Sequence, residues 1–312
     1  MAMSVIEQAA QRLEALKRST GGAVKRSTGQ DIEVVETRFG IPDPVGFAAN
    51  AAAEPGRTRT KSTQRVAIDS ARLAELGLVS PEDPKSTASE EFRVIKRPLI
   101  RNASGKSAGA IENGNLIMVT SALPGEGKTT SSVSLAMSIA MELDKTVLLV
   151  DADVAQPSVL RTLGIAERKG LLDALVDRSI DLSDVLLRTN IEKLVILPSG
   201  TQHPHATELL ASETMAALVH EIAARYPDRI IVFDSPPLLL TNEATALAAH
   251  MGQIVVVVEA EKTEHETLKQ ALALIEACPV KLLLLNKNRY GGRGGYYGTY
   301  GESGYGRSDL PA

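Results

Sequence analysis

The chain has 312 residues, 44% of them hydrophobic and 23% charged, which is ordinary for a globular protein and enough to build at least one core. Its net charge of −4 argues against a strongly basic nucleic-acid-binding protein, and its single cysteine, Cys278, excludes an internal disulfide and a cysteine-rich zinc site. No apolar run approaches the ~20 residues that cross a bilayer, so we expect a soluble, cytoplasmic protein.

Residues 1–89 form the first part of the chain and are mostly polar. Apolar residues recur at helical spacing over Ser4–Leu16, which predicts one amphipathic helix. From Ser19 to Ser89 the sequence is rich in Gly, Pro, Ser and Thr, interrupted by a short helical pattern at Asp69–Leu76. We therefore predict an N-terminal helix followed by a largely flexible linker.

From Asn115 to Asn286 short apolar runs alternate with helical patterns. The predicted strands are Leu116–Thr120, Thr146–Val150, Leu194–Leu197, Arg229–Phe233, Gln253–Val258 and Val280–Leu285. The predicted helices are Thr129–Met141, Ser158–Leu163, Gly170–Val176, Ser212–Arg225, Thr241–His250 and Thr263–Ala277, the last with a Thr263–Glu266 capping box. Strands that are apolar throughout and separated by helices predict an α/β fold, a mostly parallel sheet with helices on both faces.

The strongest motif follows the first predicted strand. Residues 121–130 read Ser-Ala-Leu-Pro-Gly-Glu-Gly-Lys-Thr-Thr, a glycine-containing loop between a strand and a helix. This is the context of a phosphate-binding loop, in which backbone N–H groups and the helix N-terminus surround a phosphate, and it indicates an ATP-binding, P-loop NTPase-type fold. The predicted nucleotide-binding residues are Pro124, Gly125, Glu126, Gly127, Lys128, Thr129 and Thr130.

Two further predicted strands end in aspartates. Asp151 and Asp153 follow Thr146–Val150, and Asp234 follows Arg229–Phe233. The carboxyl ends of parallel strands face the ligand crevice of such folds, so these carboxylates are expected beside the triphosphate. There they can hold a magnesium ion through its water molecules or accept a proton from a nucleophile. The first pair is also explained, more simply, as a cap for the next helix.

The last 24 residues, 289–312, contain eight glycines and five tyrosines and almost nothing aliphatic. Such a segment cannot bury a core, so we predict a flexible tail. Its tyrosines are either part of a sticky low-complexity tail or, beside an ATP site, acceptors of a phosphoryl group. They are Tyr290, Tyr296, Tyr297, Tyr300 and Tyr305.

Together these features resemble the bacterial tyrosine kinases, autophosphorylating P-loop enzymes of exopolysaccharide synthesis, over Glu90–Tyr305. The similar segments are Pro124–Thr129 (Walker A), Asp151–Asp153 (Walker A′), Asp234–Pro237 (Walker B) and Pro198–Ser212. The N-terminal helix and the absence of a transmembrane part are similar to the stand-alone kinases of exosortase-linked polysaccharide loci. One departure is Ala155, where the family often has an arginine.

The resemblance implies transfer of the γ-phosphate of ATP to tail tyrosines, here Tyr290 to Tyr305, of a neighbouring subunit. In that mechanism Lys128 neutralises the γ-phosphate and acts with Asp151 and Asp153 as the catalytic set, with Asp151 taking the proton of the phenol. The Mg²⁺ shell would be held by Thr129, Asp153 and Asp234. Asn286, at the end of the last strand, is expected to face the nucleotide base, as polar residues there do in related folds.

The resemblance also implies partners. Residues 90–288 would be the kinase domain, opening with Glu90–Lys96, which is similar to the Glu-x-x-Arg-x-x-Arg helix through which the family assembles into rings. Its interface residues would be Glu90, Arg93 and Lys96, the last replacing an arginine and losing its bidentate fork. The other implied partners are a membrane adaptor and a tyrosine phosphatase, with the kinase held at the inner face of the plasma membrane through the adaptor.

Two alternatives remain on the sequence. An ATPase switch of the Min/Par kind would carry a second lysine early in the loop, where this chain has Leu123, and would lack a Tyr–Gly tail. A silent ATP-binding scaffold would not need Lys128 and the three aspartates, which are all present.

Overall fold

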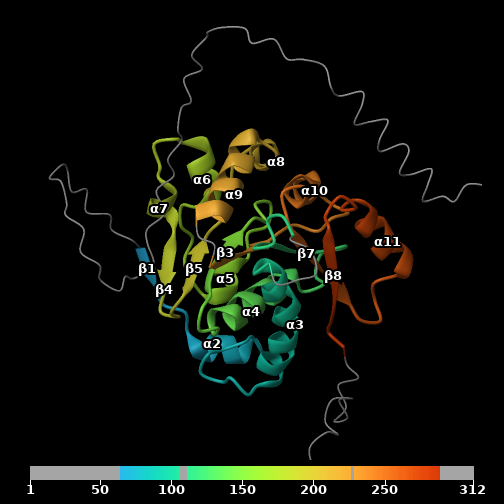
Figure 1. Ribbon diagram of the computed structural model, residues 1–312. Helices are drawn as coiled ribbons and strands as arrows, with labels where there is room; N and C mark the ends of the chain where they lie inside the picture. Colours follow the sequence, from blue (N-terminus) through green and yellow to red (C-terminus); the bar gives the residue numbers. More distant parts are fainter. Residues whose placement is uncertain (1–63, 106–110, 226–227, 289–312) are drawn as a thin grey trace, which may run out of the picture. The chain divides into compact units, whose positions relative to one another are not determined.

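A computed structural model describes residues 64–105, 111–225 and 228–288. These residues form one eight-stranded sheet with helices on both faces (Figure 1). The predicted N-terminal helix at Ser4–Leu16 and the five tail tyrosines lie outside the described residues. Within the described part of the chain, no helix is long and apolar enough to span a membrane.

The sheet has the strand order β1-β4-β5-β3-β6-β2-β7-β8, and every neighbouring pair is parallel except β4 and β5. The strands are β1 (Gln64–Val66), β2 (Leu116–Ser121), β3 (Thr146–Asp151), β4 (Leu187–Thr189), β5 (Leu194–Leu197), β6 (Arg229–Asp234), β7 (Gln253–Glu259) and β8 (Val280–Asn286). The six strands predicted from apolar runs are confirmed, and β1 and β4 are additional.

Helices cover the sheet in two groups, each over its own hydrophobic core. On one face lie α2 (Ser70–Glu75), α3 (Thr87–Ala103), α4 (Lys128–Ala140) and α5 (Val159–Leu163). On the other lie α6 (Leu171–Val176), α7 (Leu182–Val185), α8 (Ala206–Leu210), α9 (Glu213–Arg225), α10 (Asn242–Ala248) and α11 (His265–Ala273). The predicted helices are confirmed, and α7 and α8 are additional.

The central strands are apolar throughout because both of their faces are buried. In β3, Leu148 and Val150 point into one core while Val147 and Leu149 point into the other. The edge strand β8 differs from this prediction, since its side chains are alternately half-buried and exposed along its whole length. Leu282 and Leu284 pack against one core, whereas Leu283 and Leu285 are exposed, so one face of β8 is uncovered.

The predicted boundary at residue 90 is too late. β1 pairs in parallel with β4, and Ile68 and Leu73 are buried in the core beneath α4, so residues 64–89 belong to the folded unit. The short helix predicted near Asp69 is confirmed as α2, whose first turn is capped by the Asp69 side chain. A three-residue strand carries too little pattern to be recognised without its partner, which lies more than a hundred residues away.

Candidate active site

The phosphate-binding loop joins β2 to α4 and is shaped by two glycines. Gly125 and Gly127 have φ values of +82° and +100°, which side chains with a Cβ rarely adopt. Gly127 is also the N-cap of α4, and no side chain accepts a hydrogen bond from the N–H groups of the first turn. The loop therefore presents N–H groups and the positive end of a 13-residue helix to an anion.

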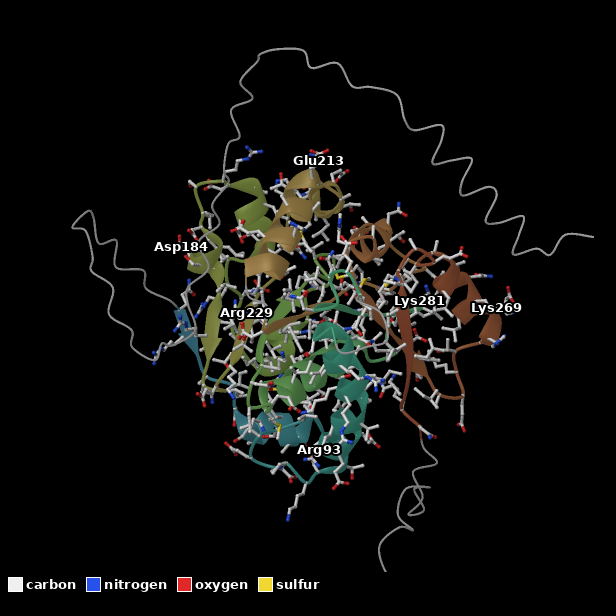
Figure 2. The ribbon with its side chains drawn as sticks, in the orientation of Figure 1. Arg93, Asp184, Glu213, Arg229, Lys269 and Lys281 are labelled. Atoms are coloured by element: carbon white, nitrogen blue, oxygen red, sulfur yellow. The ribbon has the colours of Figure 1, made fainter. Side chains whose placement is uncertain are left out.

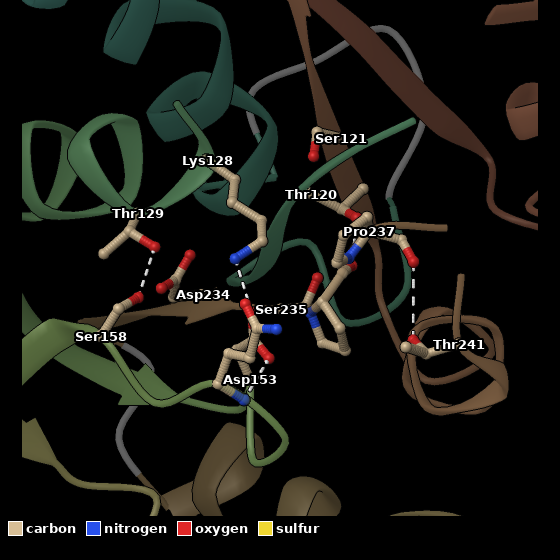
Figure 3. Close-up of polar contacts among 12 residues, drawn as sticks. Thr120, Ser121, Lys128, Thr129, Asp153, Ser158, Asp234, Ser235, Pro237 and Thr241 are labelled. Carbon is tan, nitrogen blue, oxygen red and sulfur yellow. Dashed lines mark hydrogen bonds and ion pairs between the residues drawn. The ribbon is translucent and has the colours of Figure 1, made fainter. Parts of the chain in front are cut away.

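Lys128, the first residue of α4, points across the site to the Walker A′ segment. Its Nζ atom lies 2.5 Å from Oδ2 of Asp153, and both side chains are largely buried (Figure 3). The other oxygen of Asp153 accepts a hydrogen bond from the Gln156 backbone N–H. The structure thus brings the predicted cation and one predicted carboxylate into direct contact.

Asp151 and Asp234 end adjacent strands and face each other in the register of β3 and β6. Asp151 is 1% exposed and Asp234 is fully buried. Burial, and then the negative charge of Asp234, raises the pKa of Asp151 to about 8, although N–H groups of Val159 and Ser158 oppose the shift. Burial raises the pKa of Asp234 to about 6, against the opposing charge of Lys128.

One oxygen of each of these two carboxylates is engaged by the protein, and the other is not. Oδ2 of Asp151 accepts from the backbone N–H groups of Ser158 and Val159, so the capping interpretation of Asp151 is correct for this atom. Oδ1 of Asp234 accepts from the Ser132 hydroxyl. Oδ1 of Asp151 and Oδ2 of Asp234 are buried without a hydrogen-bond partner, an arrangement that suits a cation.

These unpaired carboxylate oxygens are suitable for Mg²⁺ as nucleotide-binding sites usually coordinate it. Within residues 64–105, 111–225 and 228–288, no group of three or more His, Cys, Asp or Glu side chains could hold a metal ion by itself. Magnesium does not need such a cage, because it keeps several waters and binds one or two protein ligands together with substrate phosphates. Thr129 lies beside this cluster, with its hydroxyl 2.8 Å from that of Ser158 (Figure 3).

The outer side of the phosphate-binding loop is held by residues far away in the sequence. Glu126 is buried, accepts a hydrogen bond from the Leu123 N–H and is bound to the Thr263 hydroxyl. Asn286 donates its amide N–H to the Glu126 carbonyl, and Lys287 donates to the Gly125 carbonyl. Sequence reasoning placed Glu126 and Asn286 at the nucleotide but missed Thr263 and Lys287.

The Thr263–Glu266 capping box is wrong. Helix α11 begins at His265, its N-cap is Glu264, and the Thr263 hydroxyl is used by the loop instead. Ser132 and Ser158 were also missed. Ser132 carries a usable signal, since it lies one helical turn after Lys128 and so on the face of α4 that looks into the site.

The three residues expected at a subunit interface divide between two environments. Glu90 and Arg93 are exposed on α3 (Figure 2 labels Arg93), and Arg93 donates to the Pro84 carbonyl. Lys96 is 5% exposed and is bound within its own chain, to the Ser138 carbonyl and to Glu142, both at 2.6 Å. The expected place of Lys96 on an outer surface is therefore wrong, because Ser138 of α4 and Glu142 just after it hold its ammonium group within the same chain.

Comparison with known proteins agrees with this geometry. Residues 114–287 match a family model described as an AAA domain. The tyrosine-protein kinase YwqD of Bacillus subtilis is 32% identical over 226 residues, which cover 71% of this chain and 91% of that protein. The tyrosine-protein kinase CpsD of Streptococcus agalactiae is 31% identical over 238 residues, which cover 76% of this chain and 98% of that protein.

Solved structures have a similar fold. The chimerical protein CapA2B2 superposes with a TM-score of 0.57 and 27% identity, covering 71% of this chain and 92% of that one. The kinase domain of the Escherichia coli tyrosine kinase ETK gives a TM-score of 0.58 over 77% of this chain and 88% of that one, and at 22% identity it supports the fold alone. With its phosphate-binding loop, its strand-end aspartates and these relatives, the chain belongs to the bacterial tyrosine-protein kinase family.

Proposed function

We propose that this protein transfers the γ-phosphate of ATP to tyrosines of its own tail segment, Tyr290 to Tyr305, on a neighbouring subunit. The observation that carries the proposal is the convergence of Lys128, Asp151, Asp153 and Asp234 at the carboxyl ends of β2, β3 and β6. A chain with this cluster also contains five tyrosines among glycines directly after the folded unit. Tyrosines spaced by glycines in a segment with almost no aliphatic residues are suitable acceptors, because such a sequence does not favour a packed core.

In the proposed reaction the oxygen of a tyrosine attacks the γ-phosphorus while the bond from that phosphorus to the β,γ-bridging oxygen breaks. The phenol proton passes to Asp151, and ADP leaves with the bridging oxygen. The ionised form of Asp151 is the acceptor, and because burial raises its pKa to about 8, that form is a stronger base than an ordinary carboxylate. Lys128 would leave Asp153 and move onto the β- and γ-phosphates.

Magnesium would be held by the Thr129 hydroxyl, with Asp153 and Asp234 acting on its water molecules. When bound, it neutralises phosphate charge. The protein supplies the rest of the electrostatic stabilisation through Lys128 and the N–H groups at the start of α4. Asp234 is kept in place by the Ser132 hydroxyl, 3.0 Å from its Oδ1.

Transfer between subunits is tested by mixing two variants that cannot each complete the reaction alone. A Lys128→Ala chain keeps its tyrosines but lacks the catalytic lysine, and a chain ending at residue 288 keeps the site but lacks the tail. With Mg-ATP, peptide mass spectrometry should find phosphate on tyrosines of the Lys128→Ala chain. If only intact wild-type protein becomes labelled, transfer within one chain is indicated, and if nothing is labelled while ATP is hydrolysed, the protein is an ATPase switch of the Min/Par kind.

The wider role and the partners belong to the same proposal. By family membership we infer control of exopolysaccharide synthesis and export through reversible assembly of a ring, with Glu90 and Arg93 at the contact between subunits. We also infer a membrane adaptor that holds and activates the kinase at the inner face of the plasma membrane, and a phosphatase that resets the tail. Light scattering of unphosphorylated protein should show a lower assembled mass for Glu90→Ala combined with Arg93→Ala.

A further inference from the structure

We propose that Glu126, Asn286 and Lys287 are positioning residues that aim the N–H groups of the phosphate-binding loop at the nucleotide. We call this set the loop clamp. The inference deepens the proposed phosphoryl transfer and rests on it only for its kinase readout, since nucleotide binding can be measured alone.

The first step concerns the direction of the peptide groups. Lys287 Nζ lies 2.6 Å from the Gly125 carbonyl oxygen, and Asn286 Nδ2 lies 2.8 Å from that of Glu126. In a trans peptide the C=O of one residue points opposite to the N–H of the next, and the described residues contain no cis peptide. Holding these two carbonyls from outside therefore turns the N–H groups of Glu126 and Gly127 toward the side where a phosphate binds.

The second step concerns Glu126 itself, which is buried at a position that the loop motif leaves open. A carboxylate beside a triphosphate repels it, so burying one there needs a reason. Its two oxygens connect the loop in two directions: one accepts from the Leu123 N–H at 2.7 Å, and the other is bound to the Thr263 hydroxyl. Thr263 lies 137 residues away, in the segment between β7 and α11.

The third step concerns the fit between the two halves of the clamp. A Cβ atom at Gly127 would collide with the Asn286 amide, so the end of β8 and the loop are packed against each other without spare room. Lys287 has a φ of +56°, an uncommon value for a residue other than glycine. Strained backbone of this kind persists where surrounding contacts hold it, and here Lys287 contacts both Gly125 and Glu259.

The chain offers a matched pair of lysines for the test. Lys262 and Lys287 both form an ion pair with Oε2 of Glu259, at 3.1 and 3.2 Å, but of the two the hydrogen bond to Gly125 is made by Lys287. Full-length Lys287→Met and Lys262→Met proteins each lose one ion pair with Glu259. A difference between their nucleotide affinities therefore reports the hydrogen bond from Lys287 to Gly125. Glu126→Ala and Glu126→Gln form a second pair, since a glutamine can still accept from Leu123 and donate to Thr263.

The measurements are the Kd for Mg-ADP by calorimetry, the KM and kcat for ATP in tail phosphorylation, and the thermal midpoint without nucleotide. We expect about a fivefold weaker Kd for Lys287→Met and about tenfold for Glu126→Ala, as the loss of charge-assisted hydrogen bonds predicts. Lys262→Met should stay within about twofold of the wild type. Glu126→Gln should weaken the Kd less than Glu126→Ala does, because it keeps both hydrogen bonds and loses only the charge. KM should rise with the Kd in the two clamp variants.

Equal Kd values for Lys287→Met and Lys262→Met would overturn the proposal. A normal Kd for Glu126→Ala would also overturn the proposal, and so would a Kd for Glu126→Gln that is as weak as that of Glu126→Ala. Should Glu126→Ala fail to fold, the comparison of the two lysine variants decides alone, because both side chains are solvent-exposed and their removal leaves the core intact. If the clamp variants bind ADP more weakly but the wild-type protein never phosphorylates its tyrosines, the loop clamp is supported and the proposed kinase activity is rejected.

Discussion

Lys128 and Asp153 form an ion pair of 2.5 Å, although the proposed mechanism uses both members elsewhere. In that mechanism the lysine reaches the phosphates and the carboxylate serves the magnesium shell. The pair is also 25 residues apart in sequence and joins the Walker A loop to the Walker A′ segment. Nucleotide binding must therefore exchange this contact for two others, and the exchange can be measured.

Asp153→Asn should have opposite effects on nucleotide binding with and without magnesium. Without the metal, the variant releases Lys128 for the phosphates, so the affinity for ADP in EDTA should rise by about fivefold, as expected for removal of a competing buried ion pair. With Mg²⁺, the affinity and the rate of tail phosphorylation should both fall, since a ligand of the metal shell is lost. Calorimetry under both conditions provides the check, and a loss of affinity in EDTA would contradict the role of Asp153 as a competitor.

Asp151 should make the nucleotide-free protein less stable as the pH rises. Burial and the neighbouring Asp234 raise its pKa from 3.8 to about 8, so the native state keeps a proton that the unfolded chain has lost. The contribution to the free energy of unfolding is fully present below the unfolded pKa and is lost as the pH rises through the folded pKa, at up to about 1.4 kcal/mol per pH unit. Asp234, with a pKa raised to about 6, contributes below pH 6 in both proteins. Urea titrations of wild type and Asp151→Asn should therefore differ between pH 6 and 8, where only the wild type should show the slope, and equal slopes there would assign it to other groups.

Lys96→Met should destabilise the fold, in contrast to Glu90→Ala. The Lys96 ammonium is buried and holds both the Ser138 carbonyl and Glu142, so its removal should cost about 2 kcal/mol of unfolding free energy. Glu90 is exposed, and its removal should change stability by less than about 0.5 kcal/mol. Denaturant melts of the two monomeric variants provide the comparison. If Lys96→Met is as stable as the wild type but no longer assembles, the result would support the original prediction that Lys96 lies at the subunit interface.

Asp173→Ala should loosen the connection between α6 and the segment after β5. The Asp173 carboxylate accepts backbone N–H bonds from Gly170 at 2.8 Å and Thr201 at 3.0 Å. Burial acts to raise its pKa, but these hydrogen bonds outweigh it and hold the pKa below the usual value. Stability from this group is therefore present above the unfolded pKa and lost as the pH falls through the folded pKa. Because solvent screens this partly exposed carboxylate, urea titrations should find the variant less stable by about 1 kcal/mol at pH 7 and close to the wild type in acid.

The sequence was sufficient for the elements that carry their own pattern. Six strands, six helices and the three aspartates at strand ends follow from apolar runs and from the rule that parallel strands open toward the ligand at their carboxyl ends. The phosphate-binding loop was recognised because glycine, lysine and threonine have fixed spacing there. In each case the information lies within about ten neighbouring residues.

The features that were missed depend on pairs of residues that are distant in the chain. β1 is only three residues long and needs β4, and Thr263 and Lys287 show no role until folding places them beside the phosphate-binding loop. Lys96 follows the expected motif in sequence, but its ammonium group is buried against the Ser138 carbonyl and Glu142, which are more than forty residues away in the chain. None of these can be read from local spacing, since the deciding contact is formed only by folding.

The strand order also determines at which edges of the sheet the chain enters and leaves the folded unit. Residues 1–63 enter the sheet at β1 and residues 289–312 leave it at β8, and these two strands are its opposite edges. Seven strand spacings separate them, a distance of about 34 Å. The two chain connections to the rest of the protein therefore leave the described fold at different edges of the sheet, and a protein bound at one edge would leave the other edge accessible.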